Sequence, residues 1–387
     1  MIILAVAGLS VIVLTKTVTI HRSVFILYLL LIFFGIFYTF VGLINHPMQI
    51  GNVLKASTVT VIWPFFFLFL MPLFSQWEDI MKPINKTLIY SVLFIGVYML
   101  FAALAYLRIL PIPVELFFNT KLVEGKYDAS VQLFDPSITS LMYLLPFLIC
   151  YLLLKQGKQE GNSVFILLAG LLVGLIAMVV SGRRALILNV LLAPVLLVLF
   201  LTFKPSTVSA SLRKSLITNI ALMIGAVFVL MLLLIQTQIL NFDALLDSFL
   251  QGFDTQRDES SRVRGSQSVG LIQSFFDYPI FGSGLGTSSQ YVIRSYDTPW
   301  IYELSYLAML YQTGLSGIIY YSTMLICIVY FAVSLISKGE ISLLPHLIGL
   351  LCFLVANASN PYLAAFDHLW PLFLMLGFTN YTKLKKS

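Results

Sequence analysis

The chain contains eleven apolar runs of roughly the length that one helix needs to cross a lipid bilayer. Such a helix takes about 20 mainly apolar residues, because about 30 Å of hydrocarbon is crossed at about 1.5 Å per residue. Only 10% of the residues are charged and 59% are apolar, which is too little charge to cover a water-soluble surface. We therefore expect an all-α, polytopic membrane helix bundle, with one integral membrane domain over residues 1–387. The runs lie at 1–15, 23–44, 54–74, 88–107, 137–154, 163–181, 185–203, 216–239, 303–336, 341–357 and 366–382.

The segments between the runs alternate in charge, which predicts the orientation of the chain. Short cytoplasmic loops of membrane proteins are enriched in Lys and Arg. With the N-terminus outside, every odd-numbered gap and the C-terminal tail is basic, while the opposite gaps are mostly neutral or acidic. The basic residues of the expected inner segments are Lys16, Arg22, Lys82, Lys86, Lys155, Lys158, Lys204, Arg213, Lys214, Lys338, Lys383, Lys385 and Lys386.

Two of the expected outer loops are longer than ordinary connections. They are the smaller loop at 108–136 and the large loop at 240–302, and both lie on the outer side in this topology. Long loops inside compact proteins tend to carry function. We therefore expect the chemistry of the protein at its outer face.

The first polar cluster is the turn Ser181-Gly182-Arg183-Arg184 between two long apolar runs. Two adjacent cations at the outer boundary run against the basic-inside trend. A guanidinium presents a planar fork of donors that suits phosphate. Binding of a diphosphate is one interpretation, and anchoring of a helix end by snorkelling arginines, or a cytoplasmic turn in another topology, is the other.

The second cluster opens the large loop and mixes both signs of charge, including Arg262 and Arg264. After it, Val269, Ile272 and Phe276 recur with helical spacing, which predicts an amphipathic helix that lies on the bilayer or on the bundle. Ser260 or Ser261 would cap its start, and Tyr278-Pro279 would end it. A solvated loop whose charges pair with one another is the alternative.

Phe281-Gly282-Ser283-Gly284-Leu285-Gly286-Thr287 follows this predicted helix. No strand of a βαβ unit precedes it, so a dinucleotide-binding loop is rejected. A tight turn that lets the backbone approach a ligand or another helix explains the glycines better.

Glu303 and Tyr306 stand where the ninth apolar run begins. An acidic residue at a helix start is favoured by the helix dipole, which is one explanation for Glu303. A carboxylate beside arginines could also deprotonate an incoming hydroxyl as a general base. The four histidines are scattered without the spacing of a metal site, so we expect neither a metal nor a cofactor.

Three of these features follow one another at set distances. Arg264 stands fifteen residues before Pro279, which opens a Pro-x-x-Gly-x-Gly element. Glu303 then precedes Tyr306-Leu307 and the run Gly314-Leu315-Ser316-Gly317. With the arginine turn before them, they resemble the O-antigen polymerase and O-antigen ligase superfamily. The resemblance covers about residues 160–335.

The resemblance implies glycosyl transfer at the periplasmic face of the bacterial inner membrane. A glycan would move from undecaprenyl diphosphate to the terminal sugar hydroxyl of a lipid-linked repeat unit, by metal-independent displacement with inversion. The partners would be this lipid-linked oligosaccharide and membrane lipid. The resemblance also allows a chain-length regulator protein as a partner, and it gives no role to nucleic acid. Glu303 would accept the proton, and Arg264 and Arg184 would neutralise the departing diphosphate. Substrate binding would involve Arg183, Arg262, Tyr306, Gly282, Gly284 and Gly286.

Two departures from the family pattern bear on the assignment. The ligase branch usually carries histidine at the position of Glu303, so glutamate favours the polymerase branch. The arginine turn is doubled, and register with the following Ala-Leu run favours Arg184 over Arg183 as the matching residue. The alternatives are a ligase that joins finished glycan to lipid A-core or another acceptor, and a non-enzymatic transporter of lipid-linked oligosaccharide.

Overall fold

The structure, a computed structural model, is mainly helical within the part of the chain that it describes, with one short hairpin and an irregular coil at 278–304. That part comprises residues 20–76, 79–117, 120–123, 132–154, 163–204, 218, 225, 259–365 and 368–386. The helical prediction is therefore confirmed for this part of the chain.

Seven helical segments of the described chain are long and apolar enough to cross a membrane, and each matches an expected span. Two further expected spans are shorter helices, α14 (Leu344–Asn357) and α15 (Trp370–Lys386). The expected spans at 1–15 and 216–239 lie outside the described residues, apart from 218 and 225. A total of eleven spans therefore stays a prediction. The seven segments are Arg22–Asn45, Pro47–Met71, Met81–Tyr106, Pro136–Leu153, Val164–Ser181, Arg184–Phe203 and Ser305–Ser337.

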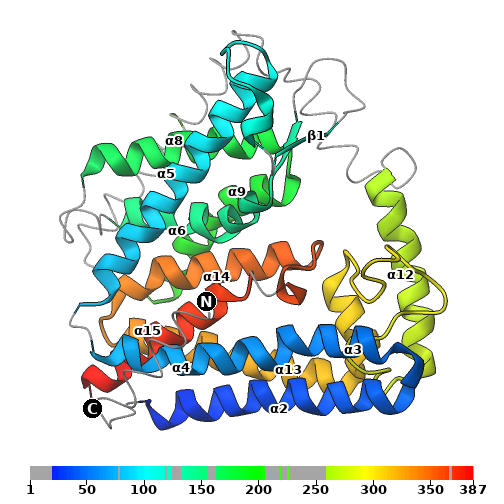
Figure 1. Cartoon of the computed structure of the whole chain (residues 1–387). Helices are drawn as coiled ribbons and strands as arrows, with labels where there is room; N and C mark the ends of the chain where they lie inside the picture. The colour runs from blue at the N-terminus through cyan, green and yellow to red at the C-terminus, as the bar shows by residue number, and fades with distance from the viewer. Residues whose placement is uncertain are drawn as a thin grey trace. The chain divides into compact units, whose positions relative to one another are not determined.

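The chain divides into two compact units, each built from segments that are distant in the sequence. The first unit takes residues 1–80, 259–335 and 357–387, and the second takes 81–258 and 336–356. Both are drawn in Figure 1.

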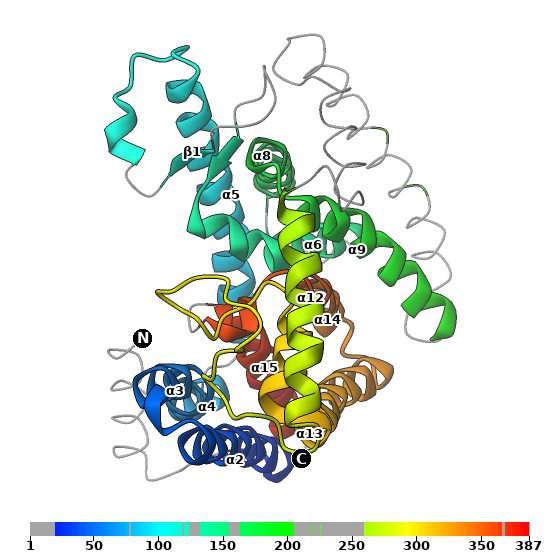
Figure 2. The ribbon, with the colours of Figure 1, turned by 90° about the vertical axis from the view of Figure 1, so that its right-hand side faces the viewer.

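The first unit packs four helical elements along one direction and sets a fifth across them. α2 (Arg22–Asn45) lies beside the continuous run formed by η1 (Pro47–Gln49), α3 (Ile50–Ser57), η2 (Thr58–Ile62) and α4 (Trp63–Gln76). α15 packs against α4, and α13 (Ser305–Ser337) lies along the axis of α2 with the opposite chain direction (Figure 1). α12 (Glu259–Asp277) instead runs at a steep angle to α2, with its C-terminal end near the end of α2 (Figures 1 and 2).

α12 is the amphipathic helix that the sequence predicts. It ends at Asp277, directly before Tyr278-Pro279, as expected. Its apolar residues Val269, Ile272 and Phe276 are 59%, 44% and 71% exposed, so this face does not pack on the described bundle. Of the two expected locations, the bilayer is the one that suits an exposed apolar face. The expectation that Ser260 or Ser261 caps the helix is wrong, because the helix includes Glu259 and both serines lie inside it.

α13 is interrupted at Gly314, where the backbone (φ 64°, ψ −172°) leaves the helical region. A helix of 33 residues would be about 50 Å long, more than a bilayer core needs. The part that follows Gly314 is by itself long enough to cross. The unusual length of the ninth apolar run is thus explained by a shorter spanning helix with a helical extension before it.

The second unit surrounds α6 (Leu141–Leu153), whose side chains are buried with few exceptions. α5 (Met81–Tyr106) packs closely on α8 (Val164–Ser181), since a Cβ at Gly96 would come within 2.5 Å of Val173. α9 (Arg184–Phe203) and α14 pack on other sides of α6. The expected loop at 108–136 contains η3 (Val114–Phe117) and the antiparallel strands β1 (Lys121–Val123) and β2 (Gln132–Phe134), and η4 (Pro136–Ser140) leads into α6.

A polar network lies inside this unit, between three apolar helices. His346 of α14 bonds through Nε2 to Asn85 Oδ1 of α5 and through Nδ1 to the Tyr143 hydroxyl of α6, both at 2.8 Å. All three side chains are at most 1% exposed. Because the Asn85 oxygen only accepts, Nε2 carries the proton and Nδ1 accepts from Tyr143. The network therefore connects α5, α6 and α14 by directional bonds in addition to apolar packing.

Candidate functional site

Glu303 lies at the centre of a charged cluster in the first unit. It precedes α13, which begins at Ser305, so it sits in the bend before the helix and not in its first turn. The expectation that Glu303 opens the helix is therefore wrong, because the helix begins two residues later, at Ser305. The Glu303 backbone N–H donates to Gln267 Oε1 at 2.9 Å, and its carbonyl accepts from the Ser305 N–H at 3.0 Å. Both ends of this residue are thereby fixed.

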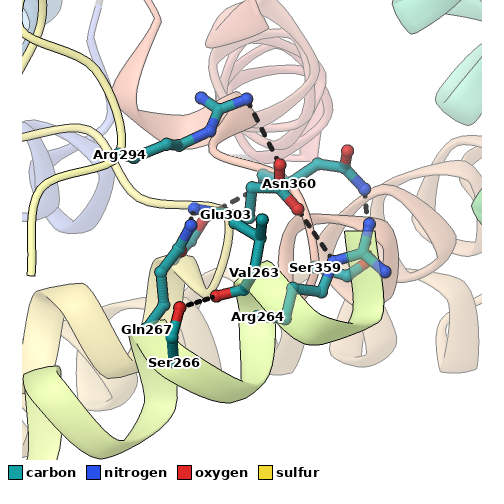
Figure 3. Close-up of polar contacts among 9 residues, drawn as sticks. Val263, Arg264, Ser266, Gln267, Arg294, Glu303, Ser359 and Asn360 are labelled. Atoms are coloured by element: carbon teal, nitrogen blue, oxygen red, sulfur yellow. Dashed lines mark hydrogen bonds and ion pairs between the residues drawn. The ribbon is translucent and has the colours of Figure 1, made fainter. Parts of the chain in front are cut away.

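Two arginines approach the Glu303 carboxylate from different segments (Figure 3). Arg264 of α12 donates from Nε to Oε2 at 2.9 Å, and Arg294 Nη2 lies 3.4 Å from Oε1. The carboxylate side chain is 18% exposed, and the two arginine side chains are 31% and 37% exposed. Two guanidiniums and one carboxylate leave the cluster with a net positive charge that solvent can reach.

Gln267 is the polar residue that joins α12 to this cluster. It follows Arg264 by three residues and so shares its helix face. The side chain is fully buried, and the bond from Glu303 fixes which end of the amide is oxygen. Its Nε2 has no hydrogen-bond partner among the described residues. A buried donor without a partner costs about 1–3 kcal/mol, so the position of this group lowers the stability of the folded protein.

The segment that carries Arg294 is held in place by hydrogen bonds to the Tyr302 hydroxyl. The Tyr302 hydroxyl accepts from the Ser289 N–H at 2.8 Å and donates to the Val292 carbonyl at 3.2 Å. Burial raises the pKa of Tyr302 to about 12, so the hydroxyl keeps the proton that it donates. Tyr302 packs with Leu271 of α12 and Ala308 and Tyr311 of α13 in one apolar cluster.

The three glycines of the predicted turn approach helix backbones closely, as the sequence suggests. Gly282, Gly284 and Gly286 have φ of 71°, 105° and 79°, which side-chain-bearing residues rarely adopt. A Cβ on Gly284 would come within 2.0 Å of the Gly42 nitrogen of α2, and one on Gly282 within 2.4 Å of Gln312 of α13. The glycine backbone therefore approaches other helices, and this close packing is sufficient to explain why glycine stands at these three positions.

This glycine segment also completes the hydrogen bonds of the interrupted helix. At Gly314 the Leu315 and Ser316 N–H groups donate to the carbonyls of Pro279 and Ile280, at 2.9 and 3.0 Å. The Tyr311 and Gln312 carbonyls accept from the Ser283 and Gly284 N–H groups, at 3.1 and 2.8 Å. Two N–H groups and two carbonyls at the break thus have partners in the glycine segment, as buried backbone requires.

The segment between α14 and α15 completes the surroundings of the cluster. The Ser305 hydroxyl donates to the Asn360 carbonyl at 2.9 Å, and Tyr306 hydrogen-bonds to Asn357. Figure 3 shows Ser359 and Asn360 beside Arg264. Tyr306, a predicted binding residue, is therefore tied to a polar segment next to the cluster.

Arg183 and Arg184 lie in the second unit, in a tight turn as predicted. Gly182 ends α8 in the left-handed conformation (φ 60°), and α9 begins at Arg184. The Arg183 guanidinium lies 5.0 Å from the centre of the Phe134 ring of β2. The turn and the folded part of the 108–136 loop therefore share one end of this unit. The Phe134 contact gives Arg183 a packing role. The choice of Arg184 over Arg183 as the family residue stays a prediction.

Of the predicted residues, the structure brings Arg264 and Glu303 into direct contact and leaves Arg262 exposed on α12. Gln267 and Arg294 were missed. Gln267 could have been found from its spacing to Arg264, whereas Arg294 lies in no motif. No group of three or more potential metal-binding His, Cys, Asp or Glu side chains is gathered within the described residues.

Comparisons with protein-family models, with curated proteins and with solved structures found no match for this chain. The resemblance to the O-antigen polymerase and ligase superfamily therefore depends on the motifs of the sequence.

Proposed function

We propose that the protein is a membrane glycosyltransferase of the O-antigen polymerase type. It would act at the periplasmic face of a bacterial inner membrane and extend a glycan that is carried on undecaprenyl diphosphate. The observation that carries the proposal is the contact of Arg264 with Glu303, because it joins the two residues to which the family resemblance gives complementary roles.

The proposed reaction is a direct displacement at the anomeric carbon. The acceptor hydroxyl gives its proton to Glu303 as its oxygen bonds to the anomeric carbon. The bond from that carbon to the diphosphate breaks, and the electron pair leaves with the diphosphate oxygen. Arginine stabilises the charge that grows on this leaving group. Proton transfer of this kind contributes about 10²–10⁴-fold to a rate.

The geometry of Glu303 suits the proposed base. Its Oε2 is occupied by Arg264, whereas Oε1 lies 3.4 Å from Arg294, beyond the usual length of a charge-assisted hydrogen bond. Oε1 therefore keeps a lone pair for a proton. Two guanidiniums nearby favour the ionised carboxylate, which is the form that accepts it.

The exposed apolar face of α12 supports a location at the membrane surface. Arg264 lies on this helix, so a helix resting on the bilayer would hold the arginine near the level of lipid head groups. The diphosphate of a lipid carrier lies at that level. A donor would then reach the cluster without leaving the membrane.

Reconstitution of the purified protein with lipid-linked repeat units tests the proposal. We expect a ladder of longer glycans on the lipid carrier without added metal or nucleotide. Single units that are never joined would contradict a polymerase. Transfer of a finished glycan to a second acceptor, without extension, would identify a ligase instead.

A further inference from the structure

Arg294 reaches Glu303 from the coil between α12 and α13, not from a helix. The coil is anchored close to it. Val292 packs so tightly on α12 that a Cβ at Gly270 would come within 2.6 Å of its side chain, and the Val292 carbonyl accepts from Tyr302. The backbone at Arg294 is thus placed by its surroundings, while 37% of its side chain stays exposed.

Glu303 holds its two arginines unequally. The contact to Arg264 has hydrogen-bond length at 2.9 Å, and the contact to Arg294 is an ion pair at 3.4 Å. A partly exposed ion pair without a well-formed hydrogen bond contributes little to stability. Arg294 is therefore the partner that Glu303 can release at small cost.

Gln267 supplies a donor that could take the place of Arg294. Its buried Nε2 is unpartnered among the described residues, and in Figure 3 its amide extends from α12 toward Glu303. Its Oε1 already holds the Glu303 backbone at 2.9 Å. The amide is thus held at the residue whose second carboxylate oxygen has only the 3.4 Å contact to Arg294.

We propose that Arg294 is an anion-binding residue that exchanges its ion pair with Glu303 for a pair with a diphosphate. Arg264 keeps Glu303 in position during the exchange, and Gln267 Nε2 donates to the carboxylate oxygen that Arg294 leaves. The identification of the anion as a diphosphate rests on the proposed function. Arrival of the donor would thereby replace one cation at Glu303 by a neutral amide, which stabilises the ionised carboxylate less, so the carboxylate becomes a better base. The second lone pair of Oε1 remains for the proton.

The exchange makes a prediction of opposite sign for the two partners. Glu303 competes with the diphosphate for Arg294, so removal of its charge should strengthen diphosphate binding. Removal of Arg294 should weaken it. A carboxylate that only builds the binding site would weaken binding when it is replaced.

The experiment measures diphosphate binding to the purified full chain in lipid nanodiscs by calorimetry. The probes are inorganic pyrophosphate and farnesyl diphosphate, which share the diphosphate and differ in the lipid. The variants are Arg294→Ala, Arg294→Gln and Glu303→Gln. Lys55→Ala serves as the control, because Lys55 is an exposed cation on α3 of the same unit. Thermal unfolding of each variant confirms that it is folded.

We expect both Arg294 variants to weaken binding about tenfold, as the loss of one charged hydrogen bond does. Glu303→Gln should strengthen binding about threefold, and Lys55→Ala should leave it unchanged. Binding of both probes means that the diphosphate suffices, and binding of farnesyl diphosphate alone means that the lipid is also recognised. In either case the Arg294 effect must appear on the probe that binds.

The exchange is wrong if Arg294→Ala binds like Lys55→Ala, if Glu303→Gln weakens binding, or if the wild type binds neither probe. These measurements need no turnover. Reconstituted protein that binds as expected but forms no polymer would therefore contradict the proposed function alone. Polymer formation with unaltered binding in both Arg294 variants would contradict the exchange alone.

Discussion

Arg264 donates from Nε to Glu303 Oε2 at 2.9 Å, across 39 residues of sequence. Arg264 lies on a helix, and Glu303 lies in the bend before another, so their contact depends on the packing of α12 against α13. The shared apolar cluster of Leu271, Tyr302, Ala308 and Tyr311 provides that packing. Chemistry at this pair and the fold of the first unit are thus directly connected.

Arg264→Ala is expected to abolish long glycan chains while the protein remains in the membrane. Removal of one preorganised donor to a developing charge lowers turnover by about 10²–10³-fold in enzymes of other kinds. Gel separation of glycans by length, together with an immunoblot of the membrane fraction, measures both effects. Normal chain-length ladders from this variant would remove Arg264 from the proposed mechanism.

Glu303→Gln is expected to lower turnover by about 10²–10⁴-fold, because the amide keeps the shape of the side chain and loses the proton acceptor. Steady-state turnover with lipid-linked repeat units measures the change. Near-normal turnover would leave Glu303 with the role of holding two arginines in place. Glu303→Asp is expected to keep more turnover than Glu303→Gln but less than the wild type. It retains a carboxylate, but its shorter side chain draws that carboxylate away from Arg264.

Gly284→Ala is expected to destabilise the protein by about 1–3 kcal/mol or more, as overpacking of a close contact does. The added Cβ would meet the Gly42 nitrogen at 2.0 Å, and a φ of 105° suits only glycine. Thermal unfolding in detergent measures the loss. Gly51→Ala is the matched control, because nothing lies within 4 Å of a Cβ there and alanine favours the helix by about 0.5–1 kcal/mol. Equal unfolding temperatures for the two variants would contradict the packing described for the glycine segment.

His346→Leu is expected to cost about 1–3 kcal/mol of stability, because Asn85 and Tyr143 each lose a buried hydrogen bond. Tyr143→Phe removes only the second of these bonds, so its loss should be smaller, about 1 kcal/mol. Unfolding temperatures in detergent compare the two variants with the wild type. A His346→Leu protein as stable as the wild type would mean that the network adds nothing to the second unit.

A nitroxide attached at Phe276→Cys is expected to lie in the lipid phase. Phe276 is on the exposed apolar face of α12, whereas exposed Ser266 of the same helix provides the control position. In electron paramagnetic resonance, the label at position 276 should be reached by oxygen more than by a water-soluble nickel complex. The label at Ser266→Cys should show the reverse. The same accessibility at both positions would place α12 away from the bilayer.

The sequence predicts the apolar helices well because each carries its own signal over about 20 residues. Pro279 likewise ends α12 where the pattern requires, and the glycines at 282, 284 and 286 predict that the backbone there comes close to other helices. These signals are local, so they can be read from the sequence without knowledge of the tertiary structure.

The features that the sequence does not predict depend on partners far along the chain. The break at Gly314 looks like ordinary helix in Gly314-Leu315-Ser316-Gly317, since the carbonyls that satisfy it come from Pro279 and Ile280. Arg294 has no motif, and its meeting with Glu303 is decided by how the coil packs on Gly270. The predicted cap at Ser260 or Ser261 fails because local propensity does not fix where α12 starts.

The division of the chain into interleaved units has a consequence for synthesis. The glycine segment bonds to the Tyr38 carbonyl through Leu285 and to Gln49 through Ser288, and the cluster is completed by Asn360. Emerging helices of the first unit must therefore wait in the membrane while residues 81–258 are made. A ribosome that stops before residue 303 releases a chain that lacks the Glu303 partner of Arg264, and one that stops before residue 360 lacks the carbonyl that accepts from Ser305. The surroundings of the cluster are therefore completed only late in translation.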